Sequence, residues 1–324
     1  MAYHAEEGIL LKKGIFSFLV TTWLLTGTTV PASATTFQSH TLNTLSFSYV
    51  ENLFDSNGTM KNGLELAPGD HLVGIISVNR IVAGGETIFT AGPTSQLTGI
   101  YAHKVLSIPP YLVNGQYAYD PLNPSSFQVH TEYGNPDLGA FTVGSSTVNL
   151  ASILDPGAVL ALWLDQGNSA TSFTTEGTLA DSVARATDGL PFLSAGIGNS
   201  GYFYSHTNQS VTMAELLNGA FIGQAFAGLE VLTNATGHGL SPIFNPGDLE
   251  KGTATPLVLS CDLGINPAFF SPEPASPWVL AGTGSVQVYP APEPSTLALF
   301  GVAGSVMALC RLRKRTLNDR EDTP

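Results

Sequence analysis

The sequence predicts a mainly β protein, an antiparallel β-sandwich-like domain with one or two helices. Apolar residues recur at every second position in several short segments, which is the period of a half-buried strand. Gly, Pro, Asn and Asp bound these segments. Many such segments at modest spacing, with no internal repeat of fixed period, are typical of two packed antiparallel sheets.

Eight segments are candidate strands. The first covers residues 45–50, where Leu45, Phe47 and Tyr49 share one face and serines occupy the other. The remaining candidates are flanked by turn residues such as Ala83-Gly84-Gly85, and they cover residues 72–82, 97–107, 127–133, 141–150, 158–164, 256–263 and 278–289.

Three segments depart from the strand pattern. Thr212 and Glu215 form a capping box before an apolar stretch that reaches Leu232, which predicts a buried helix. Thr178 opens a shorter predicted helix that ends before Gly189. Residues 267–277 contain four prolines and predict a rigid, exposed connector.

The N-terminus has the features of an export signal. Lys12 and Lys13 precede an apolar stretch over residues 15–25, and Ala32 and Ala34 supply the small residues that signal peptidase accepts. We expect residues 1–34 to form a signal peptide with a helical core, which leaves an exported body over residues 35–289. A buried core helix is the alternative interpretation.

The C-terminus has three parts in a fixed order. Pro292-Glu293-Pro294 comes first, and an apolar run over residues 297–310 follows, whose large side chains include Leu297, Leu299, Phe300, Val302, Val306 and Leu309. The chain then continues with the basic residues Arg311, Arg313, Lys314 and Arg315. This order predicts a transmembrane helix with a cytoplasmic basic end. A plain anchor is the alternative, although the run is shorter than the ~20 residues that a bilayer requires.

Residues 290–315 closely resemble the PEP-CTERM sorting signal of Gram-negative bacteria, and residues 316–324 form a polar tail. The resemblance implies export, transient retention in the inner membrane and cleavage by the membrane enzyme exosortase near Pro292, Glu293 and Pro294. It also implies a final location on the cell surface or in an exopolysaccharide matrix, as in a biofilm. The internal tripeptide over residues 272–274 lacks the other two parts and serves as a control.

Charge and cysteine content limit the body further. Between Thr35 and Ala291 the formal charge is −14, from 19 acidic and 5 basic residues, which argues against nucleic acid as a partner. Cys310 lies in the tail, so Cys261 is alone in the processed form and no intramolecular disulfide is expected. We expect Cys261 to be a buried strand residue.

Sequence motifs for catalysis or cofactor binding are weak. Residues 196–201 match the dinucleotide fingerprint by letter, but a β-prone run follows where a helix is required, so we expect a glycine-rich loop. Asp55 begins a segment like a calcium loop, yet Leu66 stands where the closing Glu belongs, which favours an Asx turn. The histidines occur singly without ligand spacing. We predict no catalytic residue, metal or cofactor.

The leading hypothesis is therefore a non-enzymatic surface or matrix protein with a structural or adhesive role, whose partners are signal peptidase, exosortase and extracellular polysaccharide. The rival is a secreted enzyme that acts on polysaccharide. A carbohydrate-binding module with exposed Trp163, Tyr202 or Tyr204 is a third option. A cleft with two facing carboxylates, one with a raised pKa, would favour the enzyme. A flat surface without pockets would favour the matrix role.

Overall fold

The protein is described from a computed structural model, and the account covers residues 37–39, 41–61, 65–108, 112–113, 116–117, 129–166, 173–207, 223–235, 240–241, 243–244, 254–266 and 276–290. The predicted signal peptide and the predicted tail helix lie outside these residues. Within them, no helix is long and apolar enough to cross a membrane.

The main antiparallel sheet confirms most of the predicted strands. It contains β1 (Asn43–Phe54), β2 (His71–Ala83), β3 (Glu86–Thr90), β4 (Ser95–Ser107), β7 (Val129–Gly134), β10 (Ala158–Gln166), β11 (Leu190–Gly196), β12 (Tyr202–Thr207), β13 (Gly223–Asn234), β14 (Leu240–Ser241), β17 (Leu257–Ile265) and β18 (Leu280–Pro290). Three separate short pairs are β5 (Leu112–Val113) with β6 (Gln116–Tyr117), β8 (Ala140–Val143) with β9 (Ser146–Asn149), and β15 (Ile243–Phe244) with β16 (Ala254–Thr255).

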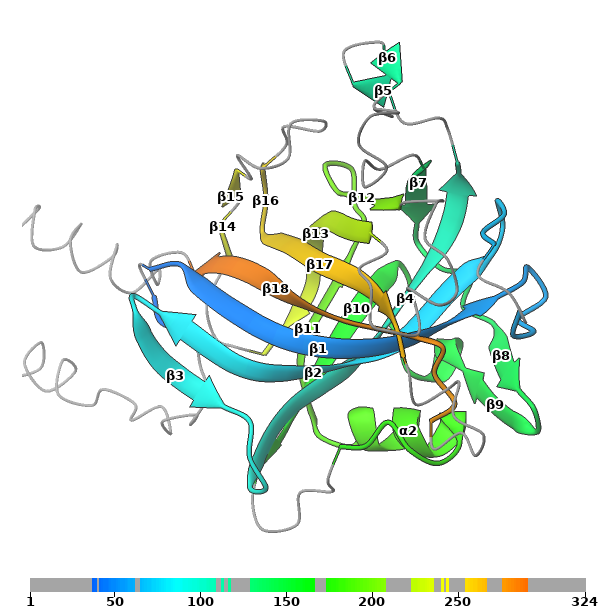
Figure 1. Cartoon of the computed structure of the whole chain (residues 1–324). Helices are drawn as coiled ribbons and strands as arrows, with labels where there is room; N and C mark the ends of the chain where they lie inside the picture. Colours follow the sequence, from blue (N-terminus) through cyan, green and yellow to red (C-terminus); the bar gives the residue numbers. More distant parts are fainter. Residues whose placement is uncertain are drawn as a thin grey trace, which may run out of the picture. The chain divides into compact units, whose positions relative to one another are not determined.

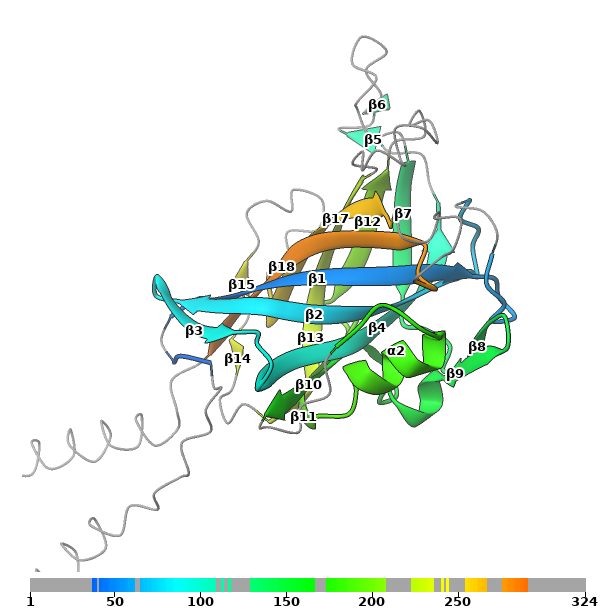
Figure 2. The same ribbon diagram turned by 60° about the horizontal axis from the view of Figure 1, so that its bottom comes forward.

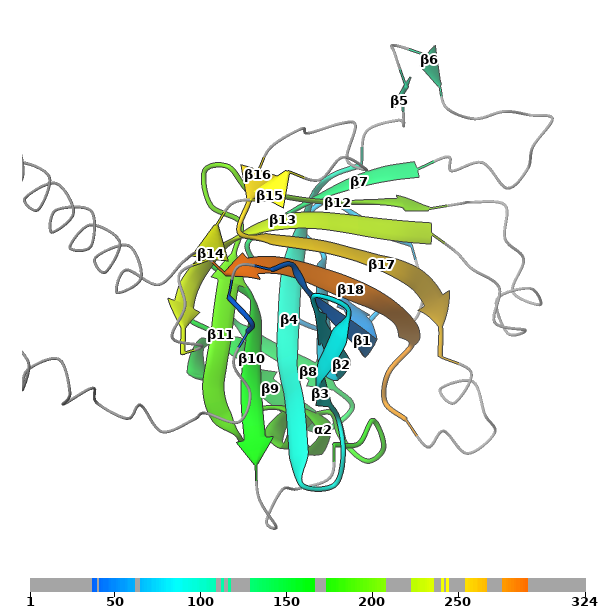
Figure 3. The ribbon, with the colours of Figure 1, turned by 90° about the vertical axis from the view of Figure 1, so that its left-hand side faces the viewer.

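The main sheet closes on itself, so the prediction of a two-sheet sandwich is wrong (Figures 1 and 3). The pairings β2 with β4 and β11 with β13 complete a barrel-like circuit that runs β1, β2, β4, β10, β11, β13, β17, β18 and back to β1. The C-terminal end of β4 and the N-terminal part of β13 are joined by a second route, in which β4 pairs with β7, β7 with β12, and β12 with β13. A sandwich and a barrel give the same alternation along each strand, because both bury one face of every strand.

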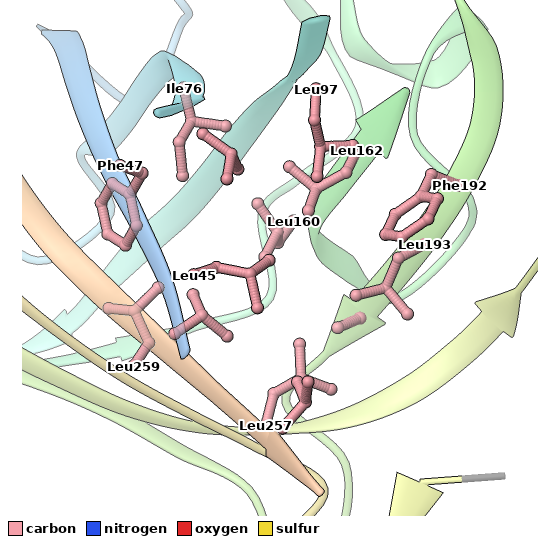
Figure 4. Close-up of a cluster of buried hydrophobic side chains, with 14 of the residues drawn as sticks. Leu45, Phe47, Ile76, Leu97, Leu160, Leu162, Phe192, Leu193, Leu257 and Leu259 are labelled. Atoms are coloured by element: carbon pink, nitrogen blue, oxygen red, sulfur yellow. The ribbon is translucent and has the colours of Figure 1, made fainter. Parts of the chain in front are cut away.

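The inward face of the sheet forms the larger apolar core (Figure 4). On β1 the inward positions follow the predicted alternation, and Leu45, Phe47 and Tyr49 are all buried. Figure 4 shows side chains from opposite strands pointing toward one another, among them Leu97, Leu160, Leu162, Phe192 and Leu257.

A second core lies on the outward face of β2 and β4, where the helix α2 (Leu179–Ala186) packs beside β8 and β9 (Figure 2). The Thr178 hydroxyl accepts the N–H of Asp181, which confirms the predicted helix start. Leu179, Val183 and Ala186 are buried against the sheet. The Thr98 hydroxyl donates to the Ala186 carbonyl at 3.0 Å and joins the last turn to β4.

The predicted buried helix up to Leu232 is wrong from Gly223 onward, because residues 223–234 form β13. Apolar residues are so frequent in this segment that they fit both the helix period and the strand period. Pairing with β12, β11 and β17 favours the strand. Residues 212–222 lie outside the described part of the chain. The single strand predicted over residues 141–150 is instead the β8–β9 hairpin, which turns at Gly144 with φ of 59°, and η1 (Leu150–Ser152) follows it.

The end of the predicted exposed connector is buried. Ser276 is 3% exposed and Trp278 is fully buried, whereas residues 267–275 lie outside the described part. The Asn52 side chain donates to the Pro277 carbonyl and accepts the N–H of Val279, both at 2.9 Å. Asn266 donates to the Trp278 carbonyl at 2.9 Å. These two amides hold the chain in place before β18 begins, which the proline content did not indicate.

Candidate functional site

Polar side chains enter the interior of the barrel-like sheet from β1. The alternation that buries Phe47 continues through Tyr49 and Glu51 to Leu53, so a carboxyl group lies among apolar inward positions. Glu51 is only 2% exposed. Its Oε2 accepts a hydrogen bond of 2.8 Å from the Tyr101 hydroxyl on β4.

Glycines on the intervening strands make these long-range contacts possible. Gly74 pairs with Glu51 on one side and with Tyr101 on the other, and a Cβ at Gly74 would lie 2.5 Å from the Tyr101 ring. The Tyr101 ring therefore lies across Gly74 and reaches β1. Gly282 has the same role for Tyr49, whose hydroxyl donates to the Asp262 carbonyl on β17 at 2.7 Å.

Glu51 is a carboxyl group whose surroundings disfavour its charge. Burial raises the pKa of Glu51 from 4.5 to about 7, and the hydrogen bond from Tyr101 offsets part of this effect. Among the described residues, Oε1 of Glu51 has no hydrogen-bond partner, and none of their ion pairs includes Glu51. A buried oxygen without a donor is unfavourable, so this atom is a position where a ligand would gain a hydrogen bond.

Aromatic rings surround the same region. The Tyr101 ring lies 5.7 Å from Tyr49 and 6.0 Å from His103, measured between centroids. His103 contacts Phe203 at 4.3 Å and Tyr133 at 4.4 Å. Burial lowers the pKa of His103 to about 3, so its imidazole is neutral at physiological pH and its Nδ1 has no partner among the described residues.

These groups line a cavity of about 460 Å³, which is within the size range of small-molecule sites. Most of the wall is apolar and comes from strands on all sides, including Leu53, Leu72, Ile76, Val159, Leu229 and Leu259. Strand ends at Val129, Thr207 and Leu263 and the exposed Glu65 form another part of it. The structure thus has an internal pocket with a few converging polar groups, in contrast to a flat surface.

Cys261 also lines this cavity, from β17. Its position on a strand is as predicted, but the side chain is only partly buried and not fully buried as predicted. Burial raises the pKa of the Cys261 thiol well above its usual range, and the Glu51 charge adds to this. The thiol is therefore protonated at neutral pH and is a poor nucleophile.

The outward face of β7 and β12 brings two histidines together that the sequence left apart. His130 Nδ1 and His206 Nε2 are 2.9 Å apart because their positions pair directly in the sheet. Within the described part of the chain, no group of three or more His, Cys, Asp and Glu side chains could hold a metal ion. Tyr202 and Tyr204 are 6% and 3% exposed, so they do not form the exposed platform considered for carbohydrate.

Two sequence predictions about loops are confirmed. Asp55 Oδ1 accepts the N–H groups of Asn57 and Thr59, each at 2.9 Å, which is the predicted Asx turn. The glycine-rich residues after Gly196 lead directly into β12, as the β-prone run predicted. Neither segment contributes to the cavity.

The candidate site residues predicted from the targeting signals lie outside the described residues. They are Ala32 and Ala34 at the N-terminus, and Pro292, Glu293, Pro294 and the segment that follows them at the C-terminus. The polar residues of the cavity were missed. The signal for Glu51 was present, because it continues the inward alternation of Leu45, Phe47 and Tyr49 by one step.

Comparison with known proteins gives one match. Residues 290–314 match the family described as the PEP-CTERM protein-sorting motif, which confirms the resemblance of the tail. The motif marks an exported protein that exosortase processes for the cell surface. Neither the curated proteins nor the solved structures include a match to the chain.

Proposed function

Because the chain carries a PEP-CTERM sorting motif, we propose that it is a non-catalytic protein of the cell surface or the exopolysaccharide matrix. Signal peptidase removes residues 1–34, the tail holds the protein in the inner membrane for a short time, and exosortase cleaves near Pro292. The body then has a structural or adhesive role in contact with extracellular polysaccharide. Its formal charge of −14 suits such a hydrated, external environment.

One observation carries this proposal. Within the described residues the last strand is β18, which ends at Pro290, and the matched motif begins at residue 290. Pairing of β18 with β1 and β17 is therefore complete before the cleavage motif is reached. Cleavage near Pro292 leaves the closed sheet intact, so the released body keeps its fold.

The proposal predicts a shortened C-terminus. Mass spectrometry of the protein from the surface or matrix fraction is expected to find chains that end near Pro292. Alanine replacement of residues 292–294 is expected to leave the chain full-length and in the membrane fraction. The same replacement at residues 272–274 is the matched control and should process normally. Intact chains ending at Pro324 in the matrix would contradict the proposal.

The rival function is a polysaccharide-active enzyme, and one feature favours it. Glu51 is a carboxyl group with a raised pKa, and Glu65 lines the same cavity. A general acid needs such a pKa. Polysaccharide, however, presents many hydroxyl groups that require partners, and the lining of this cavity is mostly apolar.

An assay of reducing ends separates the two functions. The protein purified from the producing cells is incubated with the exopolysaccharide of the same organism, and new reducing ends are measured. We expect binding or retention without turnover, because the site lacks partners for a sugar chain. Turnover that disappears in Glu51→Gln would establish the enzyme and overturn the structural role.

A further inference from the structure

The interior of the barrel-like sheet has features that a matrix role does not require. A protein that acts only through its outer surface gains most stability from a filled core. Here the inward face instead surrounds a cavity of about 460 Å³ with a carboxyl group on its wall. We propose that this cavity binds one small apolar molecule that ends in a protonated amine, with the amine at Glu51.

The position of Glu51 supports an amine. Its Oε2 is already bonded to Tyr101, whereas Oε1 has no partner among the described residues. The carboxyl group is 2% exposed, so a ligand in the cavity is the direct way to supply a donor. A charged N–H donor makes a stronger bond to a carboxylate than a neutral hydroxyl does.

The surrounding rings support a cation as well. Tyr49 precedes Glu51 by two residues on β1, Tyr101 reaches Glu51 across Gly74, and both tyrosines line the cavity. The faces of aromatic rings attract ammonium groups, and this attraction increases when water is excluded. His103 is held neutral by burial and so places no competing positive charge beside Glu51.

Charge excludes the main alternatives. At pH 8, above the pKa of Glu51, a fatty acid or another anion would bring a second negative charge to the Glu51 carboxylate in a water-poor interior, which is unfavourable. The lysines of the described residues form ion pairs elsewhere, Lys61 with Asp70 at 2.6 Å and Lys104 with Asp137 at 2.7 Å. A neutral alcohol fits the apolar wall but leaves the carboxylate charge without a counter-ion.

The test compares three probes of equal length by isothermal titration calorimetry at pH 8. They are decylamine, 1-decanol and decanoate, and the protein is the full body purified from the producing cells. We expect decylamine to bind once per chain, 1-decanol to bind about tenfold more weakly or worse, and decanoate to show no binding. Equal binding of decylamine and 1-decanol, or no binding of any probe, would overturn the proposal.

Two variants test whether the amine of the bound probe lies at Glu51. Glu51→Gln is expected to weaken decylamine about tenfold and to leave 1-decanol unchanged, which also shows that the variant is folded. Glu86→Gln removes an exposed carboxyl group that does not line the cavity, and it is the control for general attraction between the acidic protein and a cation. We expect it to change the Kd of decylamine less than twofold.

A third variant tests the cavity itself. Ala225 is buried and lines the cavity, so Ala225→Leu reduces the available volume. It is expected to weaken decylamine and 1-decanol together. Unchanged binding in Ala225→Leu, or unchanged decylamine binding in Glu51→Gln, would place the probe elsewhere and contradict the assignment. None of these outcomes depends on how the tail is processed, so the test is independent of the proposed surface function.

Discussion

We expect Glu51→Gln to be more stabilising at pH 8 than at pH 4. The free energy of unfolding of the variant minus that of the wild type should increase by on the order of 3 kcal/mol between these two pH values. The pKa of Glu51 is about 7 in the folded protein and 4.5 when exposed. The folded state therefore holds this proton more tightly, and the Glu51 contribution to stability is lost as pH rises from 4.5 through 7. A difference of that size in pKa corresponds to about 3 kcal/mol.

The titration of His103 changes stability with pH in the opposite direction. The pH dependence of the wild-type protein alone therefore does not isolate the effect of Glu51, and the variant is needed. Its pKa is lowered from 6.5 to about 3, so its contribution is complete above pH 6.5 and is lost as pH falls toward 3. Between pH 4.5 and 6.5 the two groups oppose each other in the wild-type protein. Four further described groups interact electrostatically with Glu51, namely Tyr49, Tyr101, Tyr133 and Cys261, and burial raises the pKa of each one. None of them is charged in this window.

Urea unfolding of both proteins at pH 4, 5, 6, 7 and 8 measures the effect. The difference in free energy of unfolding between Glu51→Gln and wild type cancels the contribution of His103, and the change of that difference with pH also removes any constant effect of the amide. Glu65→Gln is the matched control at an exposed carboxyl group, and its difference should stay within about 0.5 kcal/mol. A Glu51→Gln difference that does not change with pH would show that Glu51 is not buried as a carboxyl group.

The sequence predicted the strands well because alternation is a local property. Residues 45–50 and 97–107 were placed within β1 and β4, and the turn at Gly84-Gly85 has positive φ at both positions, as a two-residue hairpin requires. Closure of the sheet was not predictable in this way. It depends on pairings between strands that do not follow one another in the chain, which are β1 with β18, β2 with β4 and β11 with β13.

The tail was predictable and the cavity was not, for a related reason. Export and sorting signals are read as continuous stretches, so residues 290–314 carry the motif in their order alone. The site at Glu51 arises from three strands, because Tyr101 reaches it across Gly74. Gly74 indicates that Tyr101 can reach Glu51 only when the register of the three strands is known, because the sequence alone does not show that Gly74 lies between them.

Trp278→Ala is expected to destabilise the body by about 3–5 kcal/mol. The Trp278 side chain is fully buried in the outer core with Phe54, Ile75 and Ile100. Its backbone is fixed by Asn52 and Asn266, so the chain cannot easily move to fill the space that the ring leaves. The segment also leads directly into β18, which closes the sheet against β1 and β17.

Thermal and urea unfolding at pH 7 measure this loss, with Leu190→Ala as the control. Leu190 is 76% exposed at the start of β11, so its replacement should change the free energy of unfolding by less than about 0.5 kcal/mol. Trp278 does not line the cavity, and the fraction of Trp278→Ala that remains folded should bind decylamine as wild type does. A loss below about 1 kcal/mol would mean that residues 276–279 are not part of the core, and that the proline-rich segment is the exposed connector that its composition predicts.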